Sequence, residues 1–533
     1  MTQLIGFITV ILRGVGLVAF SGAVGGVAFA FLVLRPFSQN APTAALRLSL
    51  RLIALGGLGV GAAQLTTFAF QTWALVGQTE GWPIWPFLTT DFARTGLARA
   101  FLAFGLAATA EQLRSRLESR RAWALLTVLA LLLAATSGWL SHALGRLDGR
   151  GPLIALDALH QLGAAVWVGG LIHLIACWLW LRQPVQEAAI GPMVERFSTL
   201  AMASVAAIVA SGIGLATYYV GSMEAFVVTA YGAMVLTKVI VLAAAMILGA
   251  LNFLAVRRAR HRFGGPPRFM HGLVEAEIGL GVAILLSAAS LTSLPPAVDV
   301  TADRATVIEV GSRFLPRVPR LTSPPLENLL AVAAPISDTL AERKPEEYAW
   351  SEYNHHMSGL FVLVAGLLAL VERWRRGSWA RHWPLVFLGL AAFMFFRNDP
   401  RAWPLGPAGF WETMLNPGVL QHRIAVLLVV ALALLEWLVR VGRTPWPRAA
   451  YALPLLCAAG GALLLTHSHS NFSMKAAFLL EITHSPLGIL GVFAGWGRWL
   501  ELRLPAPENR IPGRVWTVSL ILLGAILLTY REG

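Results

Sequence analysis

The amino-acid sequence predicts an all-α protein, a polytopic bundle of transmembrane helices. Of its 533 residues, 56% are hydrophobic and only 13% are charged. A soluble protein of this length cannot bury that much apolar surface, so the composition indicates an integral membrane protein. Apolar segments of about 17–25 residues recur along the chain, and each is long enough to cross roughly 30 Å of hydrocarbon as a helix. Because these segments are continuous rather than alternating, they disfavour a transmembrane β-barrel.

About fourteen helices are predicted from these apolar segments. The first is long and lacks both a basic start and a cleavage site, so we expect a retained helix rather than a signal peptide. The two cysteines, Cys177 and Cys457, both lie in apolar segments, which argues against a disulfide framework. The predicted ranges are 3–34, 49–77, 95–113, 122–143, 152–181, 195–221, 228–256, 270–294, 352–372, 383–397, 418–440, 449–467, 475–500 and 514–530.

Arginines predict the direction of each helix, because they gather in the loops that follow odd-numbered helices. Positive charge in short loops marks the cytoplasmic side, so both termini are expected outside. In a bacterial inner membrane, this side would be the periplasm. The same loops account for the formal charge of +14 without a nucleic-acid partner. These arginine-rich loops are 35–51, 114–121, 257–268, 373–381 and 440–448.

A polar, proline-bearing stretch divides the chain. Residues 1–294 are expected to form an eight-helix membrane domain, and residues 352–533 a six-helix membrane domain with a histidine-rich outer face. Residues 295–351 are then an external connector, in which prolines argue against one continuous helix.

Histidines are concentrated at the predicted outer face, which holds eight of the twelve. His160 and His484 lie deepest, roughly 12–14 Å below the outer surface at a rise of about 1.5 Å per residue. Polar groups at that depth are costly and usually face a cavity or a partner. The eight are His142, His160, His355, His356, His422, His467, His469 and His484.

A carboxylate precedes each deep histidine by three positions, Asp157 before His160 and Glu481 before His484. This spacing places each pair on one helix face. A carboxylate that accepts one ring N–H fixes the tautomer and leaves the other nitrogen for a metal ion. A buried histidine–carboxylate hydrogen bond without a metal is the alternative.

Methionines near the same face, Met357, Met414 and Met474, favour copper. Imidazole with thioether suits Cu(I) better than calcium or magnesium, and zinc gains nothing from methionine. The sequence thus predicts one site from His142 and His160, oriented by Asp157. It predicts a second site with three or four ligands drawn from His355, His356, His422, His467, His469, His484, Met357 and Met474, oriented by Glu481.

The first 300 residues or so resemble the CopD copper-resistance family. The stretch DALHQLGAAVWVGGLIHL (157–174) resembles its signature helix. The other matching stretches keep the family's order: TTDFARTGLAR (89–99), SHA (141–143), ERFSTLAMASVAAIVASGIGLA (195–216), TAYGAMVLTKVIVLAAAMILGALNF (229–253) and AASLTSLPPA (288–297). The resemblance implies a protein that handles copper at the bacterial inner membrane, by moving it inward or by supporting periplasmic copper homeostasis.

The family's characteristic positions carry over one by one. Residues 351–533 resemble the C-terminal extension of some CopD-like proteins. The sequence has no CopC-like soluble copper-binding domain, so such a partner is expected as a separate protein. The positions carried over are His142, His160, Trp167, Gly169, Gly170, Tyr231, Gly232 and Lys238.

Three functions remain open from the sequence. The first is a copper permease that takes copper from the periplasm; with neither a Walker A motif nor a P-type ATPase DKTG motif, ATP-driven pumping is not indicated. The second is an electron-transfer protein, with His160 and His484 as ligands of a b-type haem. The third is a copper-delivery or assembly factor that holds the metal without transporting it. No enzymatic activity is expected apart from the redox alternative.

Overall fold

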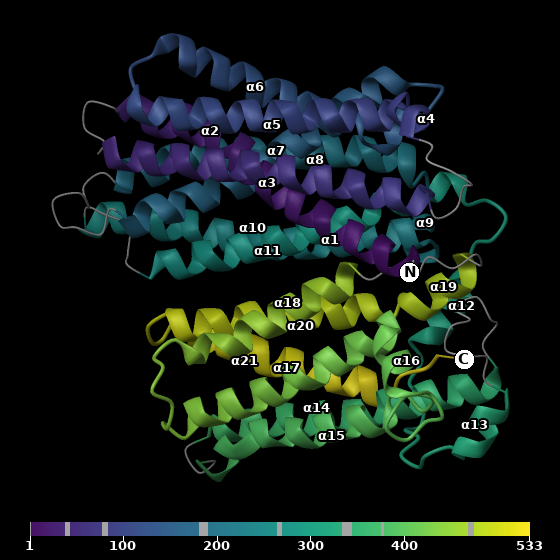
Figure 1. Cartoon of the computed structure of the whole chain (residues 1–533). Coiled ribbons are helices and arrows are strands. Elements are labelled where there is room, and N and C mark those ends of the chain that lie inside the picture. The colour runs from purple at the N-terminus through teal and green to yellow at the C-terminus, as the bar shows by residue number, and fades with distance from the viewer. Residues whose placement is uncertain are drawn as a thin grey trace. The chain divides into compact units, whose positions relative to one another are not determined.

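The computed structural model describes eight stretches of the chain, and within them it contains helices and turns but no strand. Thirteen of its helices are long and apolar enough to cross a membrane. This confirms the predicted polytopic helical fold (Figure 1). The described stretches are residues 2–37, 43–76, 84–180, 190–263, 269–332, 344–374, 378–466 and 474–532.

The chain divides into two compact units. Unit 1 comprises Met1–Phe226 and Met234–Thr301, and unit 2 comprises Val227–Ala233 and Ala302–Gly533. The predicted connector contains two short helices, α12 (Val307–Arg313) and α13 (Leu326–Val332), and both belong to unit 2.

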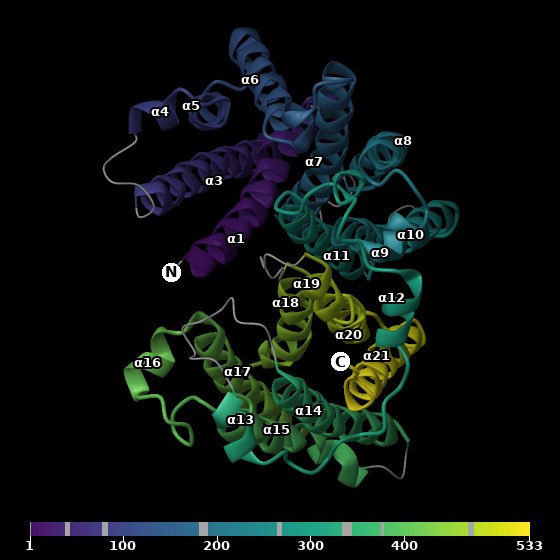
Figure 2. The same ribbon diagram turned by 90° about the vertical axis from the view of Figure 1, so that its right-hand side faces the viewer.

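Unit 1 is a bundle in which α3 packs on α5 and α1, and α7 packs on α8 (Figure 2). Its elements are α1 (Thr2–Phe20), η1 (Ser21–Gly25), α2 (Gly26–Phe29), η2 (Ala30–Leu34), η3 (Arg35–Phe37), α3 (Thr43–Val76), α4 (Ile84–Leu88), α5 (Asp91–Ser115), α6 (Arg120–Trp139), η4 (His142–Gly145), α7 (Arg150–Trp180), α8 (Ile190–Tyr219), the first half of α9 (Ala225–Val228), most of α10 (Ala230–Phe263), α11 (Met270–Leu291) and η6 (Ala297–Asp299).

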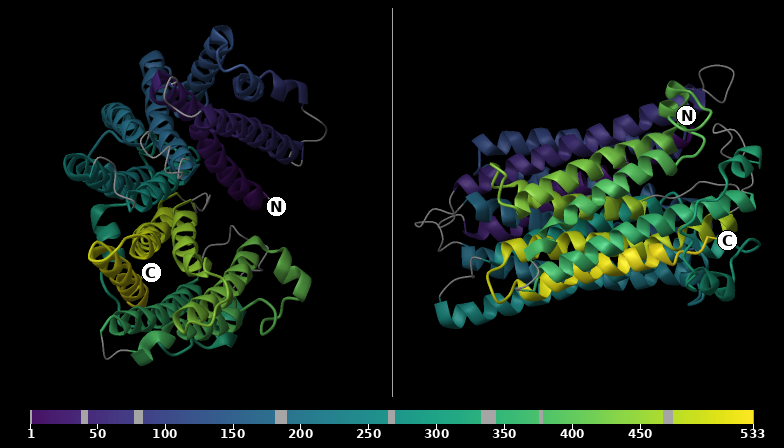
Figure 3. Two further views of the ribbon diagram at one scale, coloured as in Figure 1. Left: turned by 90° about the vertical axis from the view of Figure 1, so that its left-hand side faces the viewer. Right: turned by 90° about the horizontal axis from the view of Figure 1, so that it is seen from below.

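Unit 2 is a second bundle, in which α18 packs on α20 and α14 packs on α21 (Figure 3). Besides α12 and α13, its elements are α14 (Pro345–Glu372), η7 (Ser378–Leu385), α15 (Val386–Arg397), α16 (Phe410–Leu415), α17 (Pro417–Arg440), η8 (Ala449–Tyr451), α18 (Ala452–Thr466), α19 (Met474–Glu481), α20 (His484–Arg503) and α21 (Arg510–Leu528).

The predicted helix at 95–113 is present as α5, which is 25 residues long but is not among the thirteen apolar spans. Its charges explain the difference, and Arg99 is the buried one. The Arg99 guanidinium donates to the hydroxyls of Thr136 (2.8 Å) and Ser137 (2.9 Å) on α6. It also lies 4.8 Å from the centre of the Phe20 ring. These contacts let a charged side chain enter the bundle interior.

The predicted helix at 475–500 is two helices in the structure, α19 and α20, separated at Ile482 and Thr483. Pro486 explains the break, since it has no N–H to donate to the carbonyl four residues earlier. As a result His484 is the first residue of α20 rather than a residue inside a longer helix.

The first predicted helix contains two π-helical segments, η1 and η2. The first of them crosses α7 at very short range. A Cβ added to Gly25 would lie 2.0 Å from the Ala165 carbonyl oxygen, and one added to Gly169 would lie 1.8 Å from that of Ser21. Only glycine at both positions allows the two backbones to approach this closely.

The buried ring of His173 holds this crossing together. Its Nε2 donates to the Gly22 carbonyl in η1 (2.9 Å), and its Nδ1 accepts from the Ser49 hydroxyl on α3 (2.7 Å). One neutral tautomer therefore satisfies both ring nitrogens and joins three elements.

We expect Gly25→Ala to destabilise the protein by about 1–3 kcal/mol, because the added methyl would meet a backbone oxygen that cannot move aside. The unfolding temperature of the detergent-purified protein should fall. Gly22→Ala is the matched control, since it lies in the same π-helical segment and its Cβ would meet nothing within 4 Å. Equal unfolding temperatures for the two variants would contradict this account of the crossing.

Candidate functional site

His142, the first predicted ligand of unit 1, lies in η4 and is half-buried. Its Nε2 donates to the carbonyl of Leu291 at the end of α11 (3.4 Å), and its ring meets that of Tyr219 edge-on at 6.1 Å. Burial lowers the pKa of His142, which favours the neutral imidazole. The neutral ring is the form that binds a metal ion.

The ring of His160 points from α7 toward α8, where its Nδ1 is 3.0 Å from the carbonyl oxygen of Ile208 and 3.1 Å from the hydroxyl of Ser211. A carbonyl only accepts, so Nδ1 carries the proton and Nε2 keeps its lone pair. Asp157 was expected to accept this proton. Instead it accepts from the amide of Gln161 (3.4 Å), and a backbone carbonyl of α8 orients the histidine.

In unit 2 the rings of His355 on α14 and His484 on α20 lie together, with centroids 6.0 Å apart. Tyr530 completes the group: it stacks on His355 at 4.0 Å and lies 6.2 Å from His484. Nδ1 of His355 donates to the Ser351 carbonyl (2.8 Å), and Nδ1 of His484 donates to the Leu480 carbonyl (3.0 Å). Both rings therefore keep the lone pair on Nε2. The backbone carbonyl of Leu480 thus accepts from the Nδ1 of His484, the nitrogen that Glu481 is predicted to orient.

His355 and His484 line a cavity of about 360 Å³ within unit 2, and so does Cys457 of α18. The rest of the lining is glycine, alanine and leucine, so these three side chains are its ligand-type groups. Cys457 is a free thiol that the sequence analysis did not assign to a site. It lies farther along the cavity than the two rings, since its carbonyl oxygen is 3.5 Å from the position of a Cβ at Gly491, seven residues after His484 on α20.

The remaining predicted ligands do not join this group in the described residues. The buried His356 uses both ring nitrogens: Nδ1 accepts from the backbone N–H of Arg320 (2.7 Å), and Nε2 donates to the Tyr530 carbonyl (2.8 Å). The ring of His422, at the start of α17, donates to Asp399 (2.8 Å). Met357 is half-buried on α14.

Two predicted ligands, His467 and His469, lie outside the described residues, as does the side chain of Met474. Among the described side chains, no three from His, Cys, Asp and Glu are arranged to hold a metal ion. The two proposed haem ligands belong to different units, His160 to unit 1 and His484 to unit 2.

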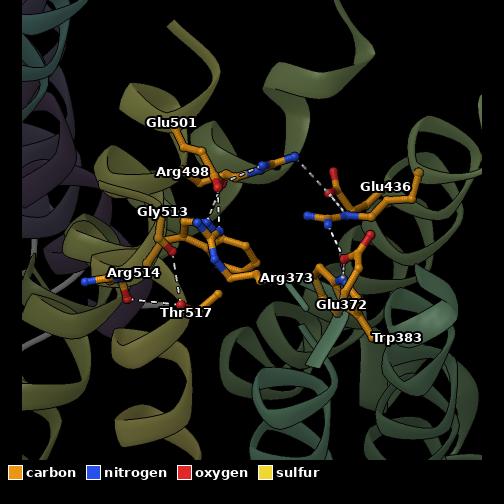
Figure 4. Close-up of polar contacts among 11 residues, drawn as sticks. Glu372, Arg373, Trp383, Glu436, Arg498, Glu501, Gly513, Arg514 and Thr517 are labelled. Carbon is orange, nitrogen blue, oxygen red and sulfur yellow. Dashed lines mark hydrogen bonds and ion pairs between the residues drawn. The ribbon is translucent and has the colours of Figure 1, made fainter. Parts of the chain in front are cut away.

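A network of six charged side chains connects these unit 2 helices to one another at the ends that lie away from His355 and His484 (Figure 4). Glu436 is at its centre and is 1% exposed; its Oε1 accepts from Arg440 (2.7 Å) and lies 3.6 Å from Arg498. Arg498 also pairs with Glu501 (2.6 Å). Three carboxylates balance three guanidinium groups, so the buried network carries no net charge. Its members are Glu372, Arg373, Glu436, Arg440, Arg498 and Glu501.

Two tryptophans extend this network to neighbouring elements. Trp383 of η7 donates its ring N–H to Glu372 (3.0 Å), and Trp516 of α21 donates to Glu501 (2.6 Å). The helices that carry the histidines at one end, α14 and α20, are therefore fixed to α17 and α21 at the other.

Part of the chain is similar to known proteins. Residues 191–291, which span most of α8 and all of α10 and α11, match the family model of copper resistance protein D. The copper transport protein CutJ of Bacillus subtilis (strain 168) is 36% identical over 144 residues, which are 27% of this chain. That alignment spans 25% of the relative's own length. No solved structure matches the chain.

Both matches carry copper in their names, and both agree with the resemblance found in the sequence. The apolar helices independently require a membrane. Together these findings indicate a multi-pass protein of the bacterial inner membrane, of which residues 191–291 are similar to the copper resistance protein D family.

Proposed function

We propose that the protein is a copper permease which takes Cu(I) from the periplasmic side and holds it in the unit 2 cavity. The observation that carries this proposal is the pair of imidazoles, His355 and His484, whose ring centroids lie 6.0 Å apart in an apolar cavity. Imidazole ligands suit copper, whereas hard cations prefer oxygen. The name of the matched relative, a copper transport protein, supports copper as the cargo.

The separation of the two rings supports a shared ion. With bonds of about 2 Å, an ion in line between two imidazole nitrogens separates the ring centroids by about 6 Å. The centroids of His355 and His484 are 6.0 Å apart. Because backbone carbonyls hold both Nδ1 atoms, Nε2 is the ligand atom of each ring. Entry of copper then needs no change of tautomer.

The ion-pair network gives this cavity a closed end. Under the predicted topology the histidines lie toward the periplasm and the network lies at the cytoplasmic ends of the same helices. Breaking a buried ion pair by removing one partner costs about 3–5 kcal/mol, so the network resists separation unless all its members move together. We propose that the network closes this side of unit 2 toward the cytoplasm.

Unit 1 supplies a second candidate position for copper. His160 presents Nε2 from a fixed tautomer, and His142 is held neutral near the predicted outer surface. We propose that this predicted site, with Asp157 nearby, passes copper on as part of the same function. A separate CopC-like protein would deliver the metal from the periplasm.

The first test is the double variant His355→Ala/His484→Ala. Competition with a chromophoric Cu(I) chelator under anaerobic conditions should show that purified full-length protein loses one copper equivalent, or binds it at least tenfold more weakly. His382→Ala is the control, because its ring contacts Trp437 and is not among the proposed ligands. Unchanged stoichiometry and affinity in the double variant would rule out this site.

Copper uptake separates the permease from a protein that only holds the metal. Proteoliposomes that contain the full-length protein should accumulate copper, and the His355→Ala/His484→Ala protein should not. Copper binding without accumulation would favour the delivery function.

A further inference from the structure

A carboxyl group lies in the apolar interior of unit 1, where the proposed copper function gives it no role. Glu277 of α11 is 6% exposed. Its Oε1 accepts from the ring N–H of Trp167 on α7 (3.0 Å), and its Oε2 accepts from the amide of Asn252 on α10 (3.1 Å). Three helices thus meet at one carboxyl group, seven residues or about 10 Å from the start of α11.

Both hydrogen bonds come from neutral donors, and within the described residues no Lys, Arg or His side chain pairs with Glu277. A carboxylate ion in the hydrocarbon region costs several kcal/mol unless a cation compensates it. Two neutral N–H groups orient the carboxyl group but leave its charge uncompensated. Protonation removes the charge.

The charged groups on the neighbouring helices are engaged or distant. Arg13 of α1 donates to Thr292 and Ser293 beyond the far end of α11. Lys238 of α10 precedes Asn252 by fourteen residues, about 21 Å along the helix, and Arg257, five residues after Asn252, is exposed.

The titratable groups of α7 and α11 are placed similarly. Asp157 and His160 precede Trp167 on α7 by ten and seven residues, and His173 is bound to Ser49 and Gly22. On α11 itself, the ring of His271 meets the Trp178 ring at 6.4 Å, and Glu275 is half-buried. Glu277 therefore titrates without a paired cation from any of these elements.

The Asn252 side chain fits both protonation states of the carboxyl group. Its Oδ1 is buried and has no hydrogen-bond partner among the described residues. When Glu277 is ionised, the amide N–H donates to Oε2. When Glu277 is protonated, rotation of the amide by half a turn lets Oδ1 accept the carboxyl O–H. The same two side chains thus stay paired in either state, and the orphaned oxygen gains its partner in the protonated one.

Space for the carboxyl group comes from Gly249, one turn before Asn252 on α10. A Cβ at Gly249 would lie 3.3 Å from Oε1 and 3.8 Å from Oε2 of Glu277. A larger side chain there would push the carboxyl group away from its two donors.

We propose that Glu277 and Asn252 form a proton-binding site in the interior of unit 1, at which the carboxyl group binds and releases one proton and Asn252 switches between donor and acceptor. The binding step forms an O–H bond at Oε2 and removes one negative charge, with no other reactant. The site does not depend on copper transport, and its test uses no copper.

Infrared spectroscopy of the full-length protein in liposomes tests the proposal. At pH 7 the unmodified protein should show a protonated-carboxyl stretching band that shifts in D₂O and is replaced by carboxylate absorption as the pH is raised. Glu277→Gln should lose that band while keeping a similar unfolding temperature, because the amide retains an acceptor for Trp167 and offers a donor to Asn252. Glu111→Gln is the control, since Glu111 is exposed and paired with Arg114.

Trp167→Phe gives a second, independent readout. Removing the hydrogen bond to Oε1 should move the carboxyl band to higher frequency without abolishing it, which a purely structural role of Glu277 would not produce. The proposal is overturned if Glu277→Gln leaves the band intact, or if the band does not respond to pH. It is also overturned if added sodium removes the band at constant pH, because the oxygen pair would then be an alkali-cation site.

Discussion

The requirement that a polar group in hydrocarbon finds its partner inside the protein governs the interior of both units. The helices satisfy their own backbones, so the polar side chains determine which helices must meet. Arg99 finds hydroxyl groups on α6, and Glu436 finds two arginines. Each such pairing fixes a helix contact more narrowly than apolar packing does, because lipid and leucine are nearly equivalent surroundings for an apolar face.

The same requirement separates the histidines by role. In His173 and His356, both ring nitrogens form hydrogen bonds within the protein, so each ring connects neighbouring elements. In His160, His355 and His484, Nδ1 donates to a backbone carbonyl. A ring of this second kind is oriented like a metal ligand, although a carbonyl replaces the carboxylate that often performs this task.

Helix positions could be predicted from the sequence because continuous apolar runs depend only on local composition. The break before His484 follows locally from Pro486, whereas the π-helical turns of η1 arise where Gly25 meets α7. The partners of the deep histidines depend on neighbouring helices. The three-residue spacing predicts that Asp157 and His160 share a helix face. The His160 side chain points toward α8 instead, where its Nδ1 donates to the Ile208 carbonyl. Cys457 has no sequence pattern linking it to His484, so only the packing of α18 on α20 brings it into the cavity.

Helix α7 connects the candidate positions of unit 1, because each of its buried polar side chains reaches a different neighbour. His160 contacts α8, Trp167 contacts Glu277 on α11, and His173 contacts η1 and α3. The glycine crossing with η1 prevents a sideways shift of α7 at Gly169. A copper ion at His160 and a proton at Glu277 would then act on the same rigid element, which is the physical condition for one to influence the other.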